Sequence, residues 1–308
     1  MRYRSFCFLF CLSYQSVGIS GQLLKPFVLA SESREDVSTV VEKVKIALSK
    51  GDFEIVGEYA PYAGAHVVVA TNDYLRRVAE SEANAIFLAG QRISITESGD
   101  GTVQVAYTNP RYFSAAYRVK ADIEPVNSAL ESTLGRVETF GARGLSSGKL
   151  SRYHYSFGME YFDDFLVLAE YDSFQRAVDV VVNSLKEGIG DSNYVYGIDL
   201  PGSQLAVFGV GIGSGMGSDS TVMDVVDFQA MKQTAHLPYE VVVQGGRVMA
   251  LAPRFRIAVD FPDLRMTGDH GFSKLMAAPD AIHKTLTLVA GKQWENPVWK
   301  SSLIGGGG

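Results

Sequence analysis

The chain has 308 residues, of which 46% are hydrophobic and 20% are charged, and its formal net charge at pH 7 is −6. This composition is typical of a folded globular protein rather than a disordered one, and the length is sufficient for two hydrophobic cores. The acidic balance argues against a nucleic-acid partner, because a protein that binds the phosphate backbone needs a basic face.

The first twenty residues have the composition of a secretory signal peptide. Arg2 and Arg4 precede an apolar stretch at residues 5–14, and small residues follow up to Ser20, near which we expect cleavage. The apolar stretch is too short to span a bilayer, and no later segment contains about 18 consecutive apolar residues. We therefore expect an exported protein without a transmembrane anchor.

Both cysteines, Cys7 and Cys11, lie within this leader. Its removal would leave a mature chain with no thiol and no disulfide, and the loss of Arg2 and Arg4 would make the net charge more negative than −6. An exported protein without disulfides is more typical of the bacterial periplasm than of eukaryotic secretion, so we expect a periplasmic location.

Apolar periodicity predicts a first α+β unit at residues 21–139. Its clearest element is an amphipathic helix at residues 37–50, which Ser33 can cap with Asp36 three residues on, and which Gly51 follows. Within this unit, strands are expected at 26–30, 53–59, 66–70, 91–96 and 102–107, and helices at 73–79, 112–117 and 125–134.

A second unit, at residues 165–292, repeats this order of elements. A Pro-Arg-aromatic sequence follows the last strand of each unit, at residues 110–112 and 253–255, and ends strand pairing because proline has no N–H to donate. We therefore predict an α+β protein of two tandem repeats, each a helix-backed antiparallel sheet in the order strand–helix–four strands–helix. The clearest elements of the second unit are a strand at 166–169, a helix at 174–185 capped by Asp172 or Ser173, a strand at 237–243 and a helix at 281–290.

Residues 140–164 join the two units. They begin as a linker rich in glycine and serine and continue into an aromatic segment at residues 153–165. After the second unit, residues 293–308 are expected to form an extended arm that ends in a disordered glycine tail.

Several of these stretches resemble the domain-of-unknown-function-302 family. The resemblance is carried by the helix at 40–51 with its exit to Phe53, the strand Arg92-Ile-Ser-Ile-Thr, and the Leu237-Pro238 step before a strand. It implies a small helix-backed antiparallel sheet of the TATA-binding-protein-like kind. The family has no agreed activity, so the resemblance implies a fold and no function. The acidic balance argues against DNA bending, which the related fold performs as a tandem pair.

The seam between the two repeats, together with the aromatic segment, is where we expect a ligand. Seams between repeated units are common pocket sites, and aromatic side chains supply a large contact area. The sequence therefore predicts a non-enzymatic binding or carrier protein for a small, largely apolar molecule. The predicted ligand-binding residues are His154, Tyr155, Phe157, Tyr161, His236, Arg111 and Arg254.

Arg111 and Arg254 are included because they are the only charged residues that recur at matching positions of the two units. Each guanidinium could bind a carboxylate or phosphate, or it could pair with an acid of the other unit and lock the two together, which is the reading we favour. His236 is included because it precedes a predicted strand, and we expect it at the margin of the sheet.

Two other classes of protein remain open. His154, Met159, His236 and His270 could ligate haem or copper in a redox partner protein, since imidazole and thioether are normal ligands for both. Their spacing matches no known ligand signature, and methionines that fill an irregular core explain the same composition. The chain could also be a structural subunit with an envelope protein as its partner.

No signature of catalysis is present in the sequence. The glycine-rich residues 209–217 contain no Gly-x-Gly-x-x-Gly frame, so we expect a flexible loop over the sheet, followed by a turn and a strand at 218–227. No Gly-x-Ser-x-Gly elbow occurs, and an enzyme is the less favoured class. The acidic pairs Asp163–Asp164 and Asp224–Asp227 are expected to be solvated charges.

Overall fold

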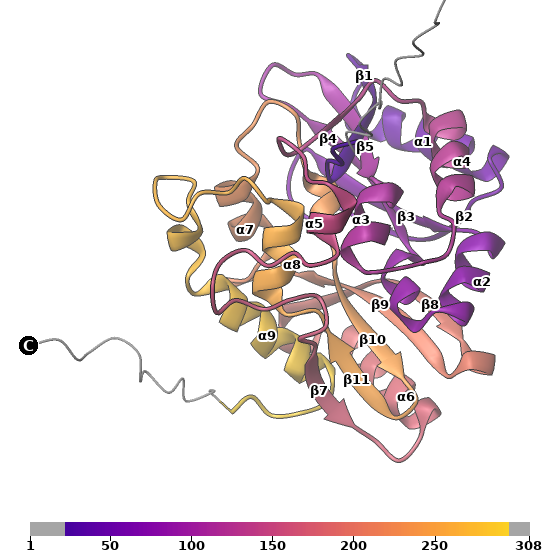
Figure 1. The fold of residues 1–308 in the computed structure, drawn as a ribbon, viewed down its shortest axis with the longest axis vertical. Helices are drawn as coiled ribbons and strands as arrows, with labels where there is room; N and C mark the ends of the chain where they lie inside the picture. The colour runs from indigo at the N-terminus through magenta and orange to yellow at the C-terminus, as the bar shows by residue number, and fades with distance from the viewer. Residues whose placement is uncertain (1–21, 296–308) are drawn as a thin grey trace, which may run out of the picture.

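A computed structural model describes residues 22–295 (Figure 1), so the predicted leader and the glycine tail lie outside the described residues. The strands form an antiparallel sheet of eleven strands in the order β6-β1-β5-β4-β3-β2-β8-β9-β10-β11-β7. The predicted α+β class with an antiparallel sheet is therefore confirmed. The described helices include none that is long and apolar enough to cross a bilayer.

The elements of the first half follow the predicted order. They are β1 (Phe27–Ser33), α1 (Val37–Lys50), β2 (Glu54–Tyr59), β3 (Ala65–Thr71), α2 (Asp73–Ser81), the 3₁₀ helix η1 (Ala83–Leu88), β4 (Gln91–Glu97), β5 (Val103–Thr108), α3 (Pro110–Ala116), α4 (Glu124–Leu134), β6 (Glu138–Phe140) and α5 (Ser147–Leu150). The cap of α1 differs from the prediction: Asp36, not Ser33, accepts the hydrogen bond from the Thr39 amide.

The second half continues the same sheet. Its elements are β7 (Leu166–Glu170), α6 (Phe174–Lys186), η2 (Ile189–Asp191), β8 (Ser192–Leu200), η3 (Pro201–Ser203), β9 (Leu205–Ile212), α7 (Asp219–Val226), η4 (Thr234–His236), β10 (Tyr239–Gln244), β11 (Arg247–Ala250), α8 (Pro253–Asp260), η5 (Phe272–Leu275) and α9 (Ala278–Val289). Ser173 caps α6, as one of the two predicted alternatives.

The prediction for the glycine-rich stretch was wrong for residues 209–212 and for the strand at 218–227, whereas residues 213–217 do form a loop. Gly209 lies inside the buried strand β9, where a Cβ atom would come within 2.2 Å of the Tyr196 ring, so only glycine fits under that ring. Residues 219–226 form the helix α7 rather than a strand, because the Ser218 side chain accepts from the Thr221 amide and Val222 and Val226 are buried on one helical face.

The two halves of the sheet meet at β2 and β8, which share one paired position, Gly57 opposite Tyr196. A Cβ atom on Gly57 would lie 2.0 Å from the Val195 carbonyl oxygen, so the close approach of the strands requires glycine there. Helices α1 and α4 lie side by side over the first half, and α9 lies beside β7 and α8 in the second (Figure 1).

The sheet is strongly curled. Residues directly opposite each other in neighbouring strands lie on the same face of the sheet. Followed from strand to strand, these pairs place Arg92 of β4, Tyr196 of β8 and Glu240 of β10 on one face. Along the sheet, β4 and β10 are about 24 Å apart. Yet Arg92 Nη1 lies 3.3 Å from Glu240 Oε2. The shared face, here called the inner face, must therefore be concave.

Short segments fill the inner face and cross between the halves. The 3₁₀ helix η1 from the first half contacts β9 and β10, and η4 from the second half contacts β3, β4 and β5. Helix α3 joins α8 through a hydrogen bond of 2.7 Å from the Tyr112 hydroxyl to the Val259 carbonyl. The largest buried hydrophobic cluster accordingly combines side chains from both halves of the chain.

Candidate functional site

A cleft of about 460 Å³ opens where the first half of the chain meets α7. The turn between β2 and β3, the hairpin between β4 and β5, and α7 with the loop after it supply its walls. We call it the seam cleft, and its lining residues are Tyr62, Ala63, Gly64, Thr96, Glu97, Ser98, Gly99, Met223, Asp224, Asp227 and Lys232. A volume of this size is within the range of small-molecule sites in proteins, about 300–1,000 Å³.

Hydroxyl groups from both halves meet beside the seam cleft. The Tyr62 hydroxyl lies 2.7 Å from Thr234 Oγ1, and Thr96 Oγ1 donates to the same oxygen over 2.9 Å. Thr234 is completely buried, so this chain of hydroxyls fixes η4 against the walls of the cleft. A second bond across the seam runs from the Tyr59 hydroxyl to Asp219 Oδ2 over 2.9 Å.

Buried carboxyl groups surround these hydroxyls. Asp227 is 8% exposed and accepts from the Gln233 amide over 2.9 Å; burial raises its pKa to about 6, against the opposing effects of that hydrogen bond and Lys232. Asp219 is 2% exposed, and burial raises its pKa to about 7. Burial also raises the pKa of Tyr62, and the charge of Asp227 raises it further.

The predicted solvated charge is therefore wrong for Asp227. Carboxyl groups with shifted pKa values beside a cleft are typical of functional sites.

Asp219→Asn is expected to reduce the pH dependence of stability. Between its ordinary pKa of 3.8 and its folded pKa of about 7, the folded state holds a proton that the unfolded state has released. The wild-type free energy of unfolding therefore falls as the pH rises through this window, by on the order of 4 kcal/mol from this carboxyl. The neutral asparagine can still accept from Tyr59, so it should remove most of this slope.

Urea unfolding of both proteins at about pH 4 and about pH 7.5 measures the difference. A variant that is as stable as the wild type at the acidic pH and more stable at the higher pH would agree with a protonated Asp219. Identical slopes for the two proteins would contradict it.

The seam cleft has an excess of negative charge. Three carboxylates, Glu97, Asp224 and Asp227, line it beside one cation, Lys232. The Lys232 ammonium donates to the Asp227 carbonyl over 3.0 Å, so part of its hydrogen-bonding capacity is already used. With the Tyr62 ring and Met223 as apolar surface, the cleft can take a small cation such as a protonated amine.

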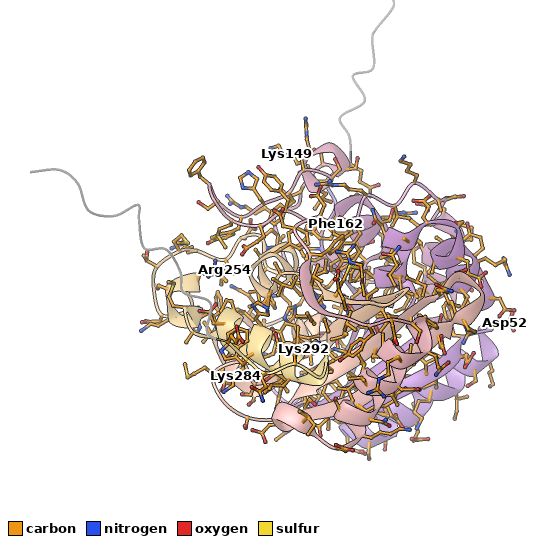
Figure 2. All side chains as sticks on the ribbon, turned by 90° about the horizontal axis from the view of Figure 1, so that it is seen from below. Asp52, Lys149, Phe162, Arg254, Lys284 and Lys292 are labelled. Carbon is orange, nitrogen blue, oxygen red and sulfur yellow. The ribbon has the colours of Figure 1, made fainter. Side chains whose placement is uncertain are left out.

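The predicted aromatic residues lie elsewhere. Phe162 (labelled in Figure 2) is 3% exposed, and its ring centroid is 5.2 Å from that of Tyr117 and 5.3 Å from that of Phe165. The buried Phe162 ring of the aromatic segment therefore packs in the core and is not available to a ligand. Among the predicted ligand residues in this segment, Phe157 is fully exposed, and the rings of His154 and Tyr161 pack on each other with centroids 4.5 Å apart.

Tyr155, the remaining predicted residue of the segment, donates from its hydroxyl to the Leu264 carbonyl over 2.6 Å and stacks on Phe272. None of the four predicted residues of the segment lines the seam cleft. What the structure brings together at the seam is instead a set of tyrosine, threonine and aspartate side chains.

The two recurring arginines pair with acids, although not in the predicted way. Arg111 makes two parallel bonds to Glu124, of 2.7 and 2.5 Å, within the first half. Arg254 lies 3.5 Å from Glu160 of the aromatic segment and 3.9 Å from Asp280 of α9. The predicted lock between the two units is therefore wrong for Arg111, whose partner begins the nearby helix α4.

His236 is in the core and not at the margin of the sheet, which corrects the prediction. It is completely buried, with Nδ1 2.8 Å from Asp260 Oδ2 and Nε2 3.3 Å from the Tyr239 hydroxyl. Burial and the neighbouring Arg256 guanidinium lower its pKa to about 4, so the ring is neutral at pH 7. Both ring nitrogens are engaged within the protein, and His236 is a structural residue.

The predicted haem or copper ligands have separate surroundings. His154 is half-buried, His236 is enclosed by Asp260 and Tyr239, and His270 stacks on Phe228 with ring centroids 4.2 Å apart. Within residues 22–295, no group of three or more His, Cys, Asp or Glu side chains is arranged to hold a metal ion. His236, whose two ring nitrogens are both engaged, is not free to ligate a metal, and ligation by His154, Met159 and His270 stays a prediction.

No family model matches the chain, and no curated protein matches it. A proposal about its function therefore depends on the chemistry of its clefts.

Proposed function

We propose that the protein binds a small cationic ligand, such as a protonated primary amine, in the seam cleft, without catalysing a reaction on it. The observation that carries this proposal is the placement of three carboxylates, one of them nearly buried, around a cleft with one partly engaged lysine. An ammonium group beside Asp227 would replace the hydration that burial has removed. The ligand is thus more polar than the largely apolar molecule that the sequence predicted.

We also propose that the two halves are tandem repeats, so that the seam cleft lies between two copies of one ancestral unit. The strand order supports this, since β1-β5-β4-β3-β2 is followed by β8-β9-β10-β11-β7 in mirrored sequence. Pro110 and Pro253 each begin a helix directly after the last strand of their half. Arg92 of β4 and Glu240 of β10 occupy matching positions in the two halves, when each is located by its partner on the neighbouring strand that leads to Pro110 or Pro253. The family resemblance stays a prediction.

Export to the periplasm belongs to the same proposal and is supported by the sequence of residues 1–20. A binding protein there would meet small solutes that have crossed the outer boundary of the cell, and an acidic cleft would select the cationic ones.

Titration calorimetry with hexylamine at about pH 7.5 tests the ligand class, with hexanol and hexanoate as neutral and anionic counterparts. Hexylamine should bind most tightly, and Asp227→Asn should weaken it at least about tenfold, because a charge-assisted hydrogen bond becomes a neutral one. Asparagine can still accept from the Gln233 amide, so the variant should fold. Asp172→Asn, at an exposed aspartate outside the cleft, should bind like the wild type.

The pH adds a second readout. Asp227 has a raised pKa of about 6, so amine binding should strengthen as the pH rises from about 5 to about 7 and the carboxyl loses its proton. Equal affinity for hexylamine and hexanol, or an unchanged affinity in Asp227→Asn, would overturn the proposal.

A further inference from the structure

A second hollow, of about 960 Å³, lies among α3, α5 and the start of α4 on the first half of the chain. We call it the basic pocket because Arg111, Arg118, Lys120 and Arg152 line it together with a single carboxylate, that of Glu124. The whole chain has a formal net charge of −6, so this cluster stands out against its surroundings. It shares no lining residue with the seam cleft.

Two of the four cations have acidic partners. Arg111 is matched by Glu124, and Arg118 makes two bonds of 2.9 Å to Asp163. Pairs of this parallel kind hold both guanidinium groups in fixed orientations. Arg111 and Arg118 therefore line the pocket with guanidinium groups whose charges are already paired with carboxylates.

The other two cations lack such partners. Across residues 22–295, no carboxylate lies within ion-pair distance of Lys120 or Arg152. Arg152 uses only its Nε, which donates to the Gly148 carbonyl over 3.3 Å, and its two terminal nitrogens have no protein partner among the described residues. Lys120 contributes only its backbone amide to the fold, which donates to Glu82 over 2.9 Å. Two uncompensated cations thus border one concave surface.

The rest of the lining combines hydroxyl donors with apolar surface. Ser114 and Ser147 add hydroxyl groups to the charged part of the pocket. Ala115, Val119 and Ile123 add apolar surface beside them; Ala115 is half-buried, and Val119 and Ile123 are 9% and 6% exposed. An inorganic anion would leave this limited apolar surface uncovered, whereas an anion with an attached hydrocarbon body would cover it.

We propose that the basic pocket is a binding site for a small amphipathic anion, with a phosphate or carboxylate headgroup between Lys120 and Arg152 and an apolar body against Ala115, Val119 and Ile123. Arginine offers paired donors that match the oxygens of such a headgroup, and lysine adds a mobile point charge. This site is independent of the seam cleft and of the cationic ligand proposed there.

Octyl phosphate, used below its critical micelle concentration, is the probe, and titration calorimetry on the whole chain is the measurement. Octanol and inorganic phosphate separate the contributions of the two halves of the probe. We expect octyl phosphate to bind at least about tenfold more tightly than either, and its affinity to fall as salt is added.

The variant Lys120→Gln/Arg152→Gln should lose at least about tenfold in affinity for octyl phosphate, since it removes both uncompensated charges. Neither side chain is buried, so the variant should fold, and its hexylamine binding should equal that of the wild type. Arg176→Gln/Lys186→Gln is the matched control, because it removes two exposed cations from α6 in the other half of the chain.

Three outcomes would overturn the proposal. Octyl phosphate could bind no better than octanol, which would remove the headgroup from the account. Inorganic phosphate could bind as tightly as octyl phosphate, which would remove the apolar body. The control pair could weaken binding as much as Lys120→Gln/Arg152→Gln, which would reduce the effect to overall charge.

Discussion

Replacing Arg92 with methionine is expected to lower the free energy of unfolding by about 3–5 kcal/mol. The side chains of Arg92 and Glu240 are each 3% exposed, and they join β4 to β10 across the inner face. Glu240 also accepts from the Tyr196 hydroxyl over 2.7 Å, and the Arg92 guanidinium lies over the Phe113 ring. Methionine fills the space but leaves the buried Glu240 charge without its ion-pair partner, which is the costly part of the change.

The double variant Arg92→Met/Glu240→Met separates this cost from packing. Once both charges are gone, no buried ion is left unpaired, so the double variant should be more stable than Arg92→Met alone. Urea unfolding of the four proteins in the cycle gives the coupling energy between the two side chains.

An exposed ion pair provides the control. Arg34 and Asp100 lie 3.5 Å apart with 72% and 65% of their side chains exposed. Arg34→Met should change the free energy of unfolding by less than about 1 kcal/mol, because water screens this pair. If Arg92→Met costs no more than Arg34→Met, the ion pair does not hold the inner face together.

Phe162→Ala is expected to destabilise the protein by about 3–5 kcal/mol, the usual cost of emptying a buried phenylalanine site. Its ring contacts Phe87 and Phe255 as well as Tyr117 and Phe165, with centroid distances to the first two of 5.9 and 6.1 Å. These rings come from η1, from α8, from Tyr117 directly after α3 and from the aromatic segment itself, so Phe162 joins four parts of the chain.

Phe157→Ala is the matched control for this prediction. It makes the same substitution in the same segment, but at a ring that is 100% exposed, and it should change stability by less than about 0.5 kcal/mol. Thermal unfolding followed by circular dichroism compares the two variants. Similar losses for both would mean that the segment contributes through its backbone and not through the Phe162 ring.

Local features of the fold could be predicted because their signals are local. The stripe of Val40, Val44 and Leu48 requires only the helical period, and all three side chains are buried as expected. The apolar pattern of α7 was present too, in Val222 and Val226 behind the cap Ser218, but the same residues were interpreted as a turn and a strand. That error came from weighing one local signal against another.

The pairing of the two halves could not be predicted, because it depends on residues far apart in the chain. Nothing near Gly209 in the sequence shows that the Tyr196 ring will cover it, and nothing near Arg92 points to Glu240. Similarly, Asp227 belongs to an ordinary acidic pair until the fold buries it beside Gln233 and Tyr62, and this burial raises its pKa. Burial, which decides the chemistry of these side chains, is a property of the assembled sheet.

The crossing of η1 and η4 has a consequence for the history of the protein. Each half of the sheet has its concave surface covered by a segment that the opposite half supplies. A fragment with only one half would leave that surface open to water, and its Arg92 or Glu240 would lack the ion-pair partner. We therefore expect neither half to fold stably alone, and if the proposed duplication is correct, a single-copy ancestor would have needed a second identical subunit to cover this surface.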